Sequence, residues 1–400
     1  MSAVHHRVVI VGGGNAGVSV ASRLRHAGVD DVAVVEPSDR HFYQPLWTLV
    51  GGGRAPLSKS VRTESSVLPR GVAWLKDRAI AIDPDRRVLE TAGGTRLSYD
   101  YLVMCPGIQL DWNAVPGMAE AVASPHASSN YQFDLAPKTW EKIRSLRSGS
   151  AVFTMPTGPI KCAGAPQKIA YLAADYWRRQ GVLADIDITL VLPTPGMFGV
   201  KEFSDELEHV AQGYGIRVLF NSEVTAIDPE SRRATISSSA GEEGTDEVGF
   251  DFLHAVPRQS APDWLKATQL ADPENPAGYV DVDKATLQHR RYPEIFALGD
   301  AGSTPNSKTG AAIRKQAPVV TANLMAAMQS QPLPAGYAGY ASCPIPTARN
   351  KLLLCEFDYS MRPAPSFPVI NTKRERRDMW FLKRYGLPFL YWHAFLPGRA

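Results

Sequence analysis

The segment at residues 7–36 constrains the fold more than any other part of the sequence, because it contains a complete unit of strand, glycine turn, helix and strand. An apolar run at residues 8–11 is followed by glycines with GxGxxG spacing, and a second apolar run covers residues 32–35. A helical pattern at residues 15–27 joins the two runs. Alternation of short apolar strands with a helix predicts parallel strands in an α/β domain.

The three glycines of this unit have separate tasks in a dinucleotide-binding turn. The first permits the tight turn, the second lets the backbone approach a pyrophosphate, and the third lets helix and strand pack closely. The helix points its free N–H groups at the phosphates, and an acidic residue after the second strand lies where a carboxylate binds an adenosine ribose. The predicted dinucleotide-binding residues are Gly12, Gly14, Asn15, Ala16, Gly17 and Glu36. The alternative is a glycine-rich turn of another α/β fold.

Composition limits the classes of protein to which the chain can belong. Its 400 residues are 44% hydrophobic and 21% charged, as in globular proteins of two or three domains. A net charge of +3 argues against a general nucleic-acid binder. The first strand begins so early that no secretory or transit peptide is expected, and no apolar run approaches the ~18 residues of a spanning helix. Four cysteines without CxxC spacing predict neither a disulfide scaffold nor a metal site.

Two later strands are expected to complete the nucleotide-binding sheet. An apolar strand at residues 99–104 runs into the tight turn of Pro106 and Gly107, as in flavin enzymes with two dinucleotide domains. Far along the chain, YPEIFALGD at residues 292–300 is a second apolar strand that ends in Asp300. In FAD proteins of this class such an aspartate binds the ribityl chain, and a helix cap is the alternative role.

Two further segments are expected to border a flavin. Lys308 and Thr309 precede an alanine-rich helix at residues 311–328, whose N-terminus would stabilise negative charge on a reduced flavin. The aromatic segment HFYQPLWTLVGGG would place Gln44 beside a planar ring, although a packed loop explains the same composition.

These positions predict an α/β protein with two Rossmann-like dinucleotide-binding domains, like the glutathione reductase-like flavoproteins, and a C-terminal membrane-interface segment. Residues 1–110 and 279–330 form a discontinuous FAD-binding domain. Residues 111–278 form the second Rossmann-like domain, and residues 331–400 form a C-terminal region.

The second domain lacks the glycine fingerprint that a nicotinamide nucleotide would need. Its first strand leads instead into PTGPIKCAGAP, where three prolines remove backbone donors. Cys162 occupies this loop, just ahead of a helix N-terminus and near Lys161 and Lys168. Positive charge and a helix N-terminus stabilise a thiolate, so Cys162 is predicted to be redox-active, with a buried structural cysteine as the alternative.

A redox cysteine needs a partner, and three cysteines remain. Cys105 and Cys355 lie in apolar strand patterns and are expected to be small core residues. Cys343 lies in ASCPIP, which is expected to be irregular, so Cys343 is the predicted partner of Cys162. His254, at the end of a strand, is a candidate proton shuttle or a structural histidine.

The C-terminal residues 379–400 are rich in aromatic and aliphatic side chains interleaved with Lys383, Arg384 and His393. They follow a basic run at residues 373–377. This pattern is typical of a segment in a membrane interface, with cations on anionic headgroups. An arm packed on the core or across a dimer interface is the alternative.

Taken together, these residues resemble the sulfide:quinone oxidoreductase family, in the two-cysteine branch that includes the mitochondrial enzyme. The resemblance covers essentially the whole chain and rests on long matches. They are HFYQPLWTLVGGG, SSNY, PIKCAGAPQKIAYL, VDVDKATLQHRRYP, SKTGAA, SCP and EFDY. No cysteine lies between Cys105 and Cys162, which fits the two-cysteine branch.

The resemblance implies that hydrogen sulfide attacks a Cys162–Cys343 disulfide or a sulfur-bridged equivalent, at Cys343. Cys162 would then pass electrons to FAD, with Lys308 stabilising the reduced flavin. A small-molecule sulfur acceptor such as glutathione, sulfite, coenzyme A or cyanide would remove the sulfane sulfur from Cys343.

The resemblance also implies that a membrane quinone receives the electrons. The residues expected at the quinone are Phe357, Phe389, Tyr391 and Trp392. The expected location is peripheral or monotopic, on the cytoplasmic face of the inner membrane of a bacterium, with a homodimer as one assembly.

Two other functions fit the same architecture. A type II NADH:quinone reductase has this arrangement of domains, but the missing second glycine fingerprint counts against it. A non-catalytic flavin-binding redox sensor would keep the fold without turnover. Reduction of the flavin by sulfide, by NADH or by neither separates the three.

Overall fold

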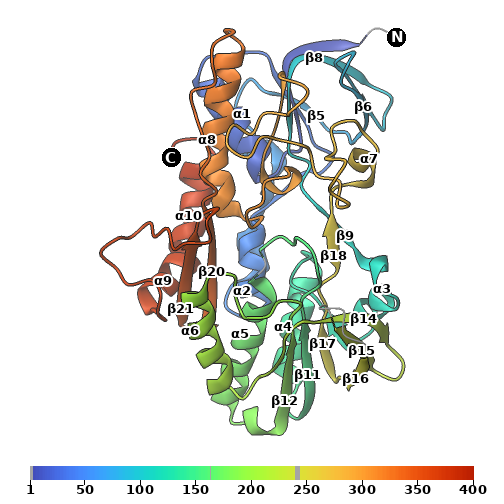
Figure 1. Ribbon diagram of the computed structural model, residues 1–400, viewed down its shortest axis with the longest axis vertical. Helices are drawn as coiled ribbons and strands as arrows, with labels where there is room; N and C mark the ends of the chain where they lie inside the picture. The colour runs from blue at the N-terminus through green and yellow to red at the C-terminus, as the bar shows by residue number, and fades with distance from the viewer. Residues whose placement is uncertain (1–2, 163, 239–243) are drawn as a thin grey trace.

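The computed structural model describes residues 3–162, 164–238 and 244–400, which form two main sheets, one mixed and one parallel, covered by helices (Figure 1). In Figure 1 the sheet with β1 (Val4–Val11) lies at the top and the sheet with β11 (Gly149–Thr154) lies at the bottom. The C-terminal residues, drawn in red, run along one side. The predicted α/β fold with two Rossmann-like sheets is confirmed.

The upper sheet is built around β1, whose residues 8–11 are buried. β1 pairs in parallel with β2 (Val32–Val35) and β8 (Arg96–Met104), and β8 pairs in parallel with β19 (Ile295–Ala297). The other strands of this sheet are β5 (Ala73–Leu75), β6 (Ala79–Asp83) and β7 (Val88–Thr91). Residues 8–11 of β1 and the whole of β2 are apolar and buried, because both faces of the parallel part of the sheet are covered.

Two helices from distant parts of the sequence cover one face of the upper sheet. They are α1 (Asn15–His26) and α8 (Gly310–Ala327), which pack against each other and share one apolar cluster with β1 and β19. The segment at residues 261–282 covers the other face. The dinucleotide turn therefore lies where α1 leaves the carboxyl end of β1.

The lower sheet has the strand order β10, β17, β11, β12, β13, and all its pairs are parallel. Its other strands are β10 (Ala127–Ser128), β12 (Ile186–Val191), β13 (Arg217–Leu219) and β17 (Phe252–His254). The predicted helix after Cys162 is α5 (Ala165–Gln180), and it packs on one face of this sheet with α6 (Lys201–Gly213). Gly181 ends α5 in the left-handed conformation.

The chain passes between the two sheets twice, through the antiparallel pair β9 (Gln109–Asp111) and β18 (Arg258–Ser260). An antiparallel sheet of β14, β15 and β16 covers the second face of the lower sheet. The remaining strands are β3 (Arg40–Phe42), β4 (Val61–Thr63), β14 (Ser222–Asp228), β15 (Arg233–Ser238) and β16 (Thr245–Gly249). The remaining helices before the C-terminal region are α2 (Trp47–Gly51), α3 (Met118–Ala123), α4 (Leu135–Ser145) and α7 (Asp263–Lys266).

Cys343 lies in a regular strand, so the prediction of an irregular segment is wrong. β20 (Ala341–Ala348) pairs with β21 (Lys351–Phe357) as a hairpin that packs on α5. The prolines 344 and 346 are tolerated because residues two apart direct their backbone N–H positions to the same side of a strand, which here is the unpaired side. The regular strand fixes Cys343 opposite Cys355.

The C-terminal region ends in a nearly continuous helical run. It consists of α9 (Arg377–Phe381), the π-helical η7 (Leu382–Gly386), α10 (Leu387–Leu390) and the π-helical η8 (Tyr391–Phe395). Some of its side chains are buried against the body of the protein and others are exposed. Within the described parts of the chain, no helix has both the length and the hydropathy that a membrane crossing requires.

Candidate active site

The two predicted redox cysteines lie side by side, although 181 positions separate them in the sequence. Cys162 lies in the turn between β11 and α5, and Cys343 lies in the neighbouring strand β20. Their Sγ atoms are 3.3 Å apart. Cys343 is buried and Cys162 is half-buried, so the pair meets solvent on the side of Cys162.

A buried lysine accompanies the pair. Lys168, in the first turns of α5, places its Nζ atom 2.8 Å from the Sγ atom of Cys162. Burial alone would lower the pKa of Lys168, but the two cysteine sulfurs outweigh burial and raise it. The ammonium therefore keeps its proton next to the sulfur.

The two thiols have opposite shifts in pKa. The hydrogen bond from Cys343 lowers the pKa of Cys162 well below its usual range, against the effect of burial, and the charge of Lys168 lowers it further. The same hydrogen bond and burial raise the pKa of Cys343. In the reduced pair the thiolate therefore resides on Cys162, and Cys343 remains a thiol.

Two hydrogen bonds hold the Cys162 turn, one from the loop before α8 and one from the segment between β10 and α4. The backbone N–H of Cys162 donates to the carbonyl of Lys308 at 2.8 Å, and its carbonyl accepts from the Tyr131 hydroxyl at 3.2 Å. Cys162 has a φ angle of 53°, which a residue with a Cβ adopts only when its surroundings enforce it. The cysteine of the lower domain is thus held directly beside the residues that precede α8.

The glycine turn has the shape of a dinucleotide cradle. Gly12 has a φ angle of 102°, and a Cβ there would lie 2.3 Å from the carbonyl oxygen of Cys105. A Cβ on Gly17 would lie 1.9 Å from the carbonyl oxygen of Gly12. At Gly14, by contrast, a Cβ would meet no atom within 4 Å among the described residues, so this position faces open space at the N-terminus of α1. The residues present therefore fit the pyrophosphate of FAD.

Glu36 lies at the end of β2 as predicted, and it also holds the turn. Its carboxylate accepts from the backbone N–H of Gly13 at 2.8 Å and from that of Ser38 at 2.8 Å. Burial raises the pKa of Glu36. A second buried carboxylate, that of Glu64, lies beside Glu36. Sequence reasoning missed its role, because the polar residues 63–66 around it have the composition of a surface turn.

The residues around α8 meet the cysteine turn. The Nζ atom of Lys308 donates to the carbonyls of Asp300 and Gly302, and it lies 3.6 Å from the centre of the Tyr279 ring. Burial lowers the pKa of Lys308 to about 8 and raises that of Asp300. Thr309 caps α8, with its hydroxyl accepting from the N–H of Ala312. In this structure the Lys308 ammonium is therefore held by backbone carbonyls of the segment that precedes α8.

Two other lysines converge on the segment around Gln44. Lys161 donates to the side-chain oxygen of Gln44 at 2.8 Å, and Lys383 donates to the carbonyl of Pro45 at 2.8 Å. Burial lowers the pKa of Lys161 to about 8 and that of Lys383 to about 7. Sequence reasoning noted Lys383 only as one cation of an amphipathic segment. Lys383 lies three and four positions after Trp380 and Met379, and this helical spacing from large apolar residues was the available signal for a buried role.

The remaining predicted site residues lie in different places. Pro106 and Gly107 follow β8 beside the glycine turn, and Gly107 has a φ angle of 78°. His254 is completely buried, its Nε2 atom accepts from the N–H of Asn130 at 3.0 Å, and burial lowers its pKa to about 3. His254 is therefore a neutral structural histidine.

The structure does not bring the four predicted quinone residues into one pocket. Phe357 is buried and packs on Phe198 in the lower domain. Tyr391 and Trp392 are buried in another cluster with Val18 of α1. The Phe389 ring is 64% exposed.

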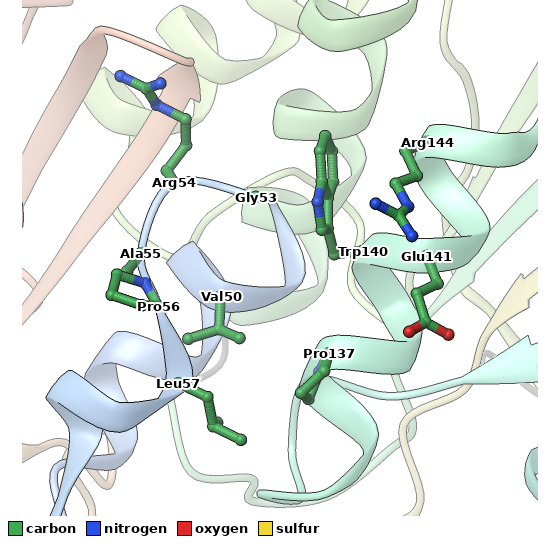
Figure 2. A pocket seen from close by; sticks show the side chains of 10 residues that line it. All are labelled: Val50, Gly53, Arg54, Ala55, Pro56, Leu57, Pro137, Trp140, Glu141 and Arg144. Atoms are coloured by element: carbon green, nitrogen blue, oxygen red, sulfur yellow. The ribbon is translucent and has the colours of Figure 1, made fainter.

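A half-open cavity of about 440 Å³ lies between α2 and α4 (Figure 2). In Figure 2, Trp140 and Pro137 of α4 face Val50 and Leu57 across it. Neither cysteine lines it. The lining residues are Val50, Gly53, Arg54, Ala55, Pro56, Leu57, Pro137, Trp140, Glu141 and Arg144.

Comparison with known proteins agrees with this geometry. Residues 6–318 match the family described as pyridine nucleotide-disulphide oxidoreductase. The chain is 41% identical to the mitochondrial sulfide:quinone oxidoreductase of Mus musculus, over 98% of this chain and 87% of that protein. It is 40% identical to the mitochondrial sulfide:quinone oxidoreductase of Dictyostelium discoideum, over 98% of this chain and 86% of that protein.

A solved structure, the sulfide:quinone oxidoreductase of Aquifex aeolicus, has the same fold. It superimposes with a TM-score of 0.83 over 100% of this chain and 93% of that chain, at 20% sequence identity.

These comparisons correct the predicted location. The sequence led us to expect the cytoplasmic face of a bacterial plasma membrane. That expectation is wrong, because three relatives that each match 98% of the chain are mitochondrial proteins of eukaryotes.

Proposed function

Since the chain belongs to the sulfide:quinone oxidoreductases, FAD-binding members of the pyridine nucleotide-disulphide oxidoreductase family, we propose that it oxidises hydrogen sulfide and passes two electrons to a quinone. The observation that carries this proposal is the pair Cys162 and Cys343, with Lys168 at 2.8 Å from Cys162. Two adjacent thiols with a fixed cation are suited to thiol–disulfide chemistry rather than to hydride transfer from a nicotinamide.

In the first step, hydrosulfide attacks Cys343 of the oxidised pair, joined directly or through an additional sulfur. In the disulfide, the bond between hydrosulfide and the Cys343 sulfur forms, the bond between the two cysteine sulfurs breaks, and its electron pair stays on Cys162 as a thiolate. In the sulfur-bridged form, the bond from Cys343 to the bridging sulfur breaks, and the leaving group is a persulfide anion on Cys162. The thiol with the lower pKa is the better leaving group. The pKa of Cys162 is lowered and that of Cys343 is raised, so this direction of attack is favoured.

Lys168 acts on this step through its charge. Its ammonium faces the sulfur on which negative charge develops, so it stabilises Cys162 as the leaving thiolate. The raised pKa of Lys168 keeps the ammonium protonated throughout. The persulfide on Cys343 then gives its outer sulfur to a small nucleophile such as glutathione, sulfite, coenzyme A or cyanide, which leaves a reduced Cys162 and Cys343. Bound FAD would be the two-electron oxidant that lets the pair close again.

Bound FAD supplies the two-electron carrier between Cys162 and the quinone. On the side of the dinucleotide, Gly12, Gly14 and Gly17 would admit the pyrophosphate, and Glu36 would bind the ribose. The site residues around the ring system are proposed to be Gln44, Pro106, Gly107, Asp300, Lys308 and Thr309.

The quinone end is proposed to lie along the exposed side of the C-terminal helices. Phe381, Tyr385 and Phe389 are 60%, 56% and 64% exposed, and their spacing of four residues aligns them on one helix face. Exposed aromatic side chains in one row favour contact with a membrane surface. Of the residues predicted to meet the quinone, Phe389 lies in this row.

An anaerobic titration with sulfide followed by a short-chain quinone tests the function. We expect sulfide to bleach the flavin absorbance and quinone to restore it. Cys162→Ser should abolish bleaching by sulfide while dithionite still bleaches the flavin. Cys355→Ala, which changes a buried cysteine opposite Cys343, is the matched control and should respond as the parent protein does.

Two outcomes contradict the proposal. Bleaching by NADH without bleaching by sulfide would identify a type II NADH:quinone reductase. No bleaching by either reductant would identify a flavin-binding redox sensor.

A further inference from the structure

A buried chain of hydrogen bonds joins the C-terminal helices to the glycine turn. The hydroxyl of Tyr391 lies 2.6 Å from the Nε2 atom of His41. The Nδ1 atom of His41 lies 3.0 Å from the carbonyl oxygen of Gly13 and 3.3 Å from Oε2 of Glu64. The side chains of His41, Glu64 and Tyr391 are all at most 3% exposed. Water therefore does not compete for the hydrogen bonds between these side chains.

The partners of His41 determine where its proton lies. The carbonyl oxygen of Gly13 can only accept a hydrogen bond, so Nδ1 carries the proton and donates. In the neutral imidazole, Nε2 is then an acceptor, and the Tyr391 hydroxyl donates to it. Each group from Tyr391 to Gly13 thus has a hydrogen-bond partner, and removal of the tyrosine hydroxyl leaves Nε2 unsatisfied in a buried site.

Gly13 is held from three sides. Its N–H donates to Glu36 at 2.8 Å and its carbonyl accepts from His41. A Cβ on Gly13 would lie 2.6 Å from Oε1 of Glu64 and 2.7 Å from Cγ of Glu36. Gly13 stands between the first two glycines of the fingerprint, so these contacts fix the shape of the turn that meets the pyrophosphate.

The Tyr391 end of this chain of hydrogen bonds is fixed by apolar packing. The Tyr391 ring lies 4.3 Å from the Tyr43 ring between centroids, and it shares a cluster with Val18 of α1 and Leu172 of α5. Beyond it, the carbonyl of Ala400 accepts from Arg23 of α1. The C-terminal helices therefore lie on the helix that begins at the glycine turn.

We propose that Glu64, His41 and Tyr391 are positioning residues that couple the seating of the C-terminal helices to the shape of the dinucleotide turn. FAD retention then depends on a hydroxyl 350 positions away from His41 in the sequence. This assigns Tyr391 a role at the nucleotide turn in place of the contact with quinone that the sequence suggested.

The test is Tyr391→Phe, which removes one oxygen and keeps the ring. We expect FAD to bind about fivefold more weakly, because one buried hydrogen bond is lost. FAD release from the holoenzyme, followed by the rise in flavin fluorescence, measures this. The KM for quinone, measured with FAD in excess, should stay within about twofold.

Two further variants connect the effect to the chain. Tyr214→Phe is the matched control, because its buried hydroxyl donates to the carbonyl of Thr347 at 2.8 Å in the lower domain. It should leave FAD release unchanged. His41→Asn keeps an N–H for Gly13 but cannot reach Tyr391, so Tyr391→Phe should add little to its effect on FAD release.

The opposite pattern overturns the proposal. If Tyr391→Phe raises the KM for quinone and leaves FAD release unchanged, Tyr391 belongs to the quinone site. If the effects of His41→Asn and Tyr391→Phe on FAD release are additive, or if neither variant changes it, the chain does not position the turn. Should Tyr391→Phe fail to fold, Glu64→Gln with the same fluorescence measurement decides the question, and unchanged FAD release would refute the proposal.

Discussion

At the scale of single residues, two cysteines of the same chemistry are made unequal by their surroundings. Cys162 lies beside a cation and stands at the end of a hydrogen bond from Cys343, while Cys343 is buried in a strand. The result is a preformed leaving group and a preformed electrophile. Glu64 and His41 have a comparable role at the glycine turn, where they define the position of a backbone carbonyl.

Removal of the Lys168 charge should move the pKa of Cys162. Lys168→Met takes away a cation that lowers the pKa of Cys162, so this pKa rises. The thiolate exists only above the pKa, so the acidic limb of Cys162 alkylation shifts to higher pH. The measurement is the rate of iodoacetamide labelling of the reduced protein against pH.

Lys201→Met is the control for this experiment, because Lys201 pairs with Asp205 on the surface. Its labelling profile should match that of the parent protein. An unshifted profile for Lys168→Met would mean that Cys343 and the backbone, rather than Lys168, set the pKa of Cys162.

At the scale of elements, the glycines in the turn between β1 and α1 have two different tasks. Gly12 and Gly17 are needed for the fold, and Gly14 is needed for the ligand. Gly12 and Gly17 leave no room for a Cβ, because an added Cβ would lie 2.3 Å and 1.9 Å, respectively, from a backbone oxygen. Gly14 has a φ angle of −70°, which alanine adopts freely, and open space beside it. The open side of Gly14 is therefore the side toward the ligand.

Gly14→Ala is expected to fold normally and to bind FAD on the order of tenfold more weakly, because the methyl group would occupy the approach of the pyrophosphate. Apoprotein unfolding and FAD titration measure the two effects separately. Gly213→Ala, at the end of α6 with open space beside it, is the control and should change neither. Unchanged FAD affinity in Gly14→Ala would place the pyrophosphate elsewhere.

At the scale of the whole molecule, the C-terminal region joins parts that the sequence order separates. Its hairpin brings Cys343 onto α5 of the lower domain, and its helices lie on α1 of the upper domain. Lys383 reaches from these helices to the carbonyl of Pro45. One side of the helical run is thus packed on the protein, and the row of Phe381, Tyr385 and Phe389 is left exposed.

The exposed row should mediate binding to membranes. Phe381→Ser combined with Phe389→Ser is expected to lower the fraction that sediments with anionic phospholipid vesicles at least tenfold, because each buried phenyl ring contributes about 1.5–3 kcal/mol. Flavin reduction by sulfide in solution should be unchanged. Ile80→Ser, which alters an exposed apolar residue of β6, should sediment as the parent does, and equal sedimentation of all three proteins would refute this role.

The sequence by itself determined the local units, because strand, glycine turn and helix are encoded by residues close together. It placed α1, which follows the dinucleotide turn, and α8 within one residue of their observed ends, and it marked Cys162 by the loss of the second glycine fingerprint. Only the tertiary structure decided which distant groups meet. The distance between the cysteine sulfurs, the strand around Cys343 and the burial of Tyr391 against His41 depend on packing between segments far apart in the chain, for which no local pattern exists.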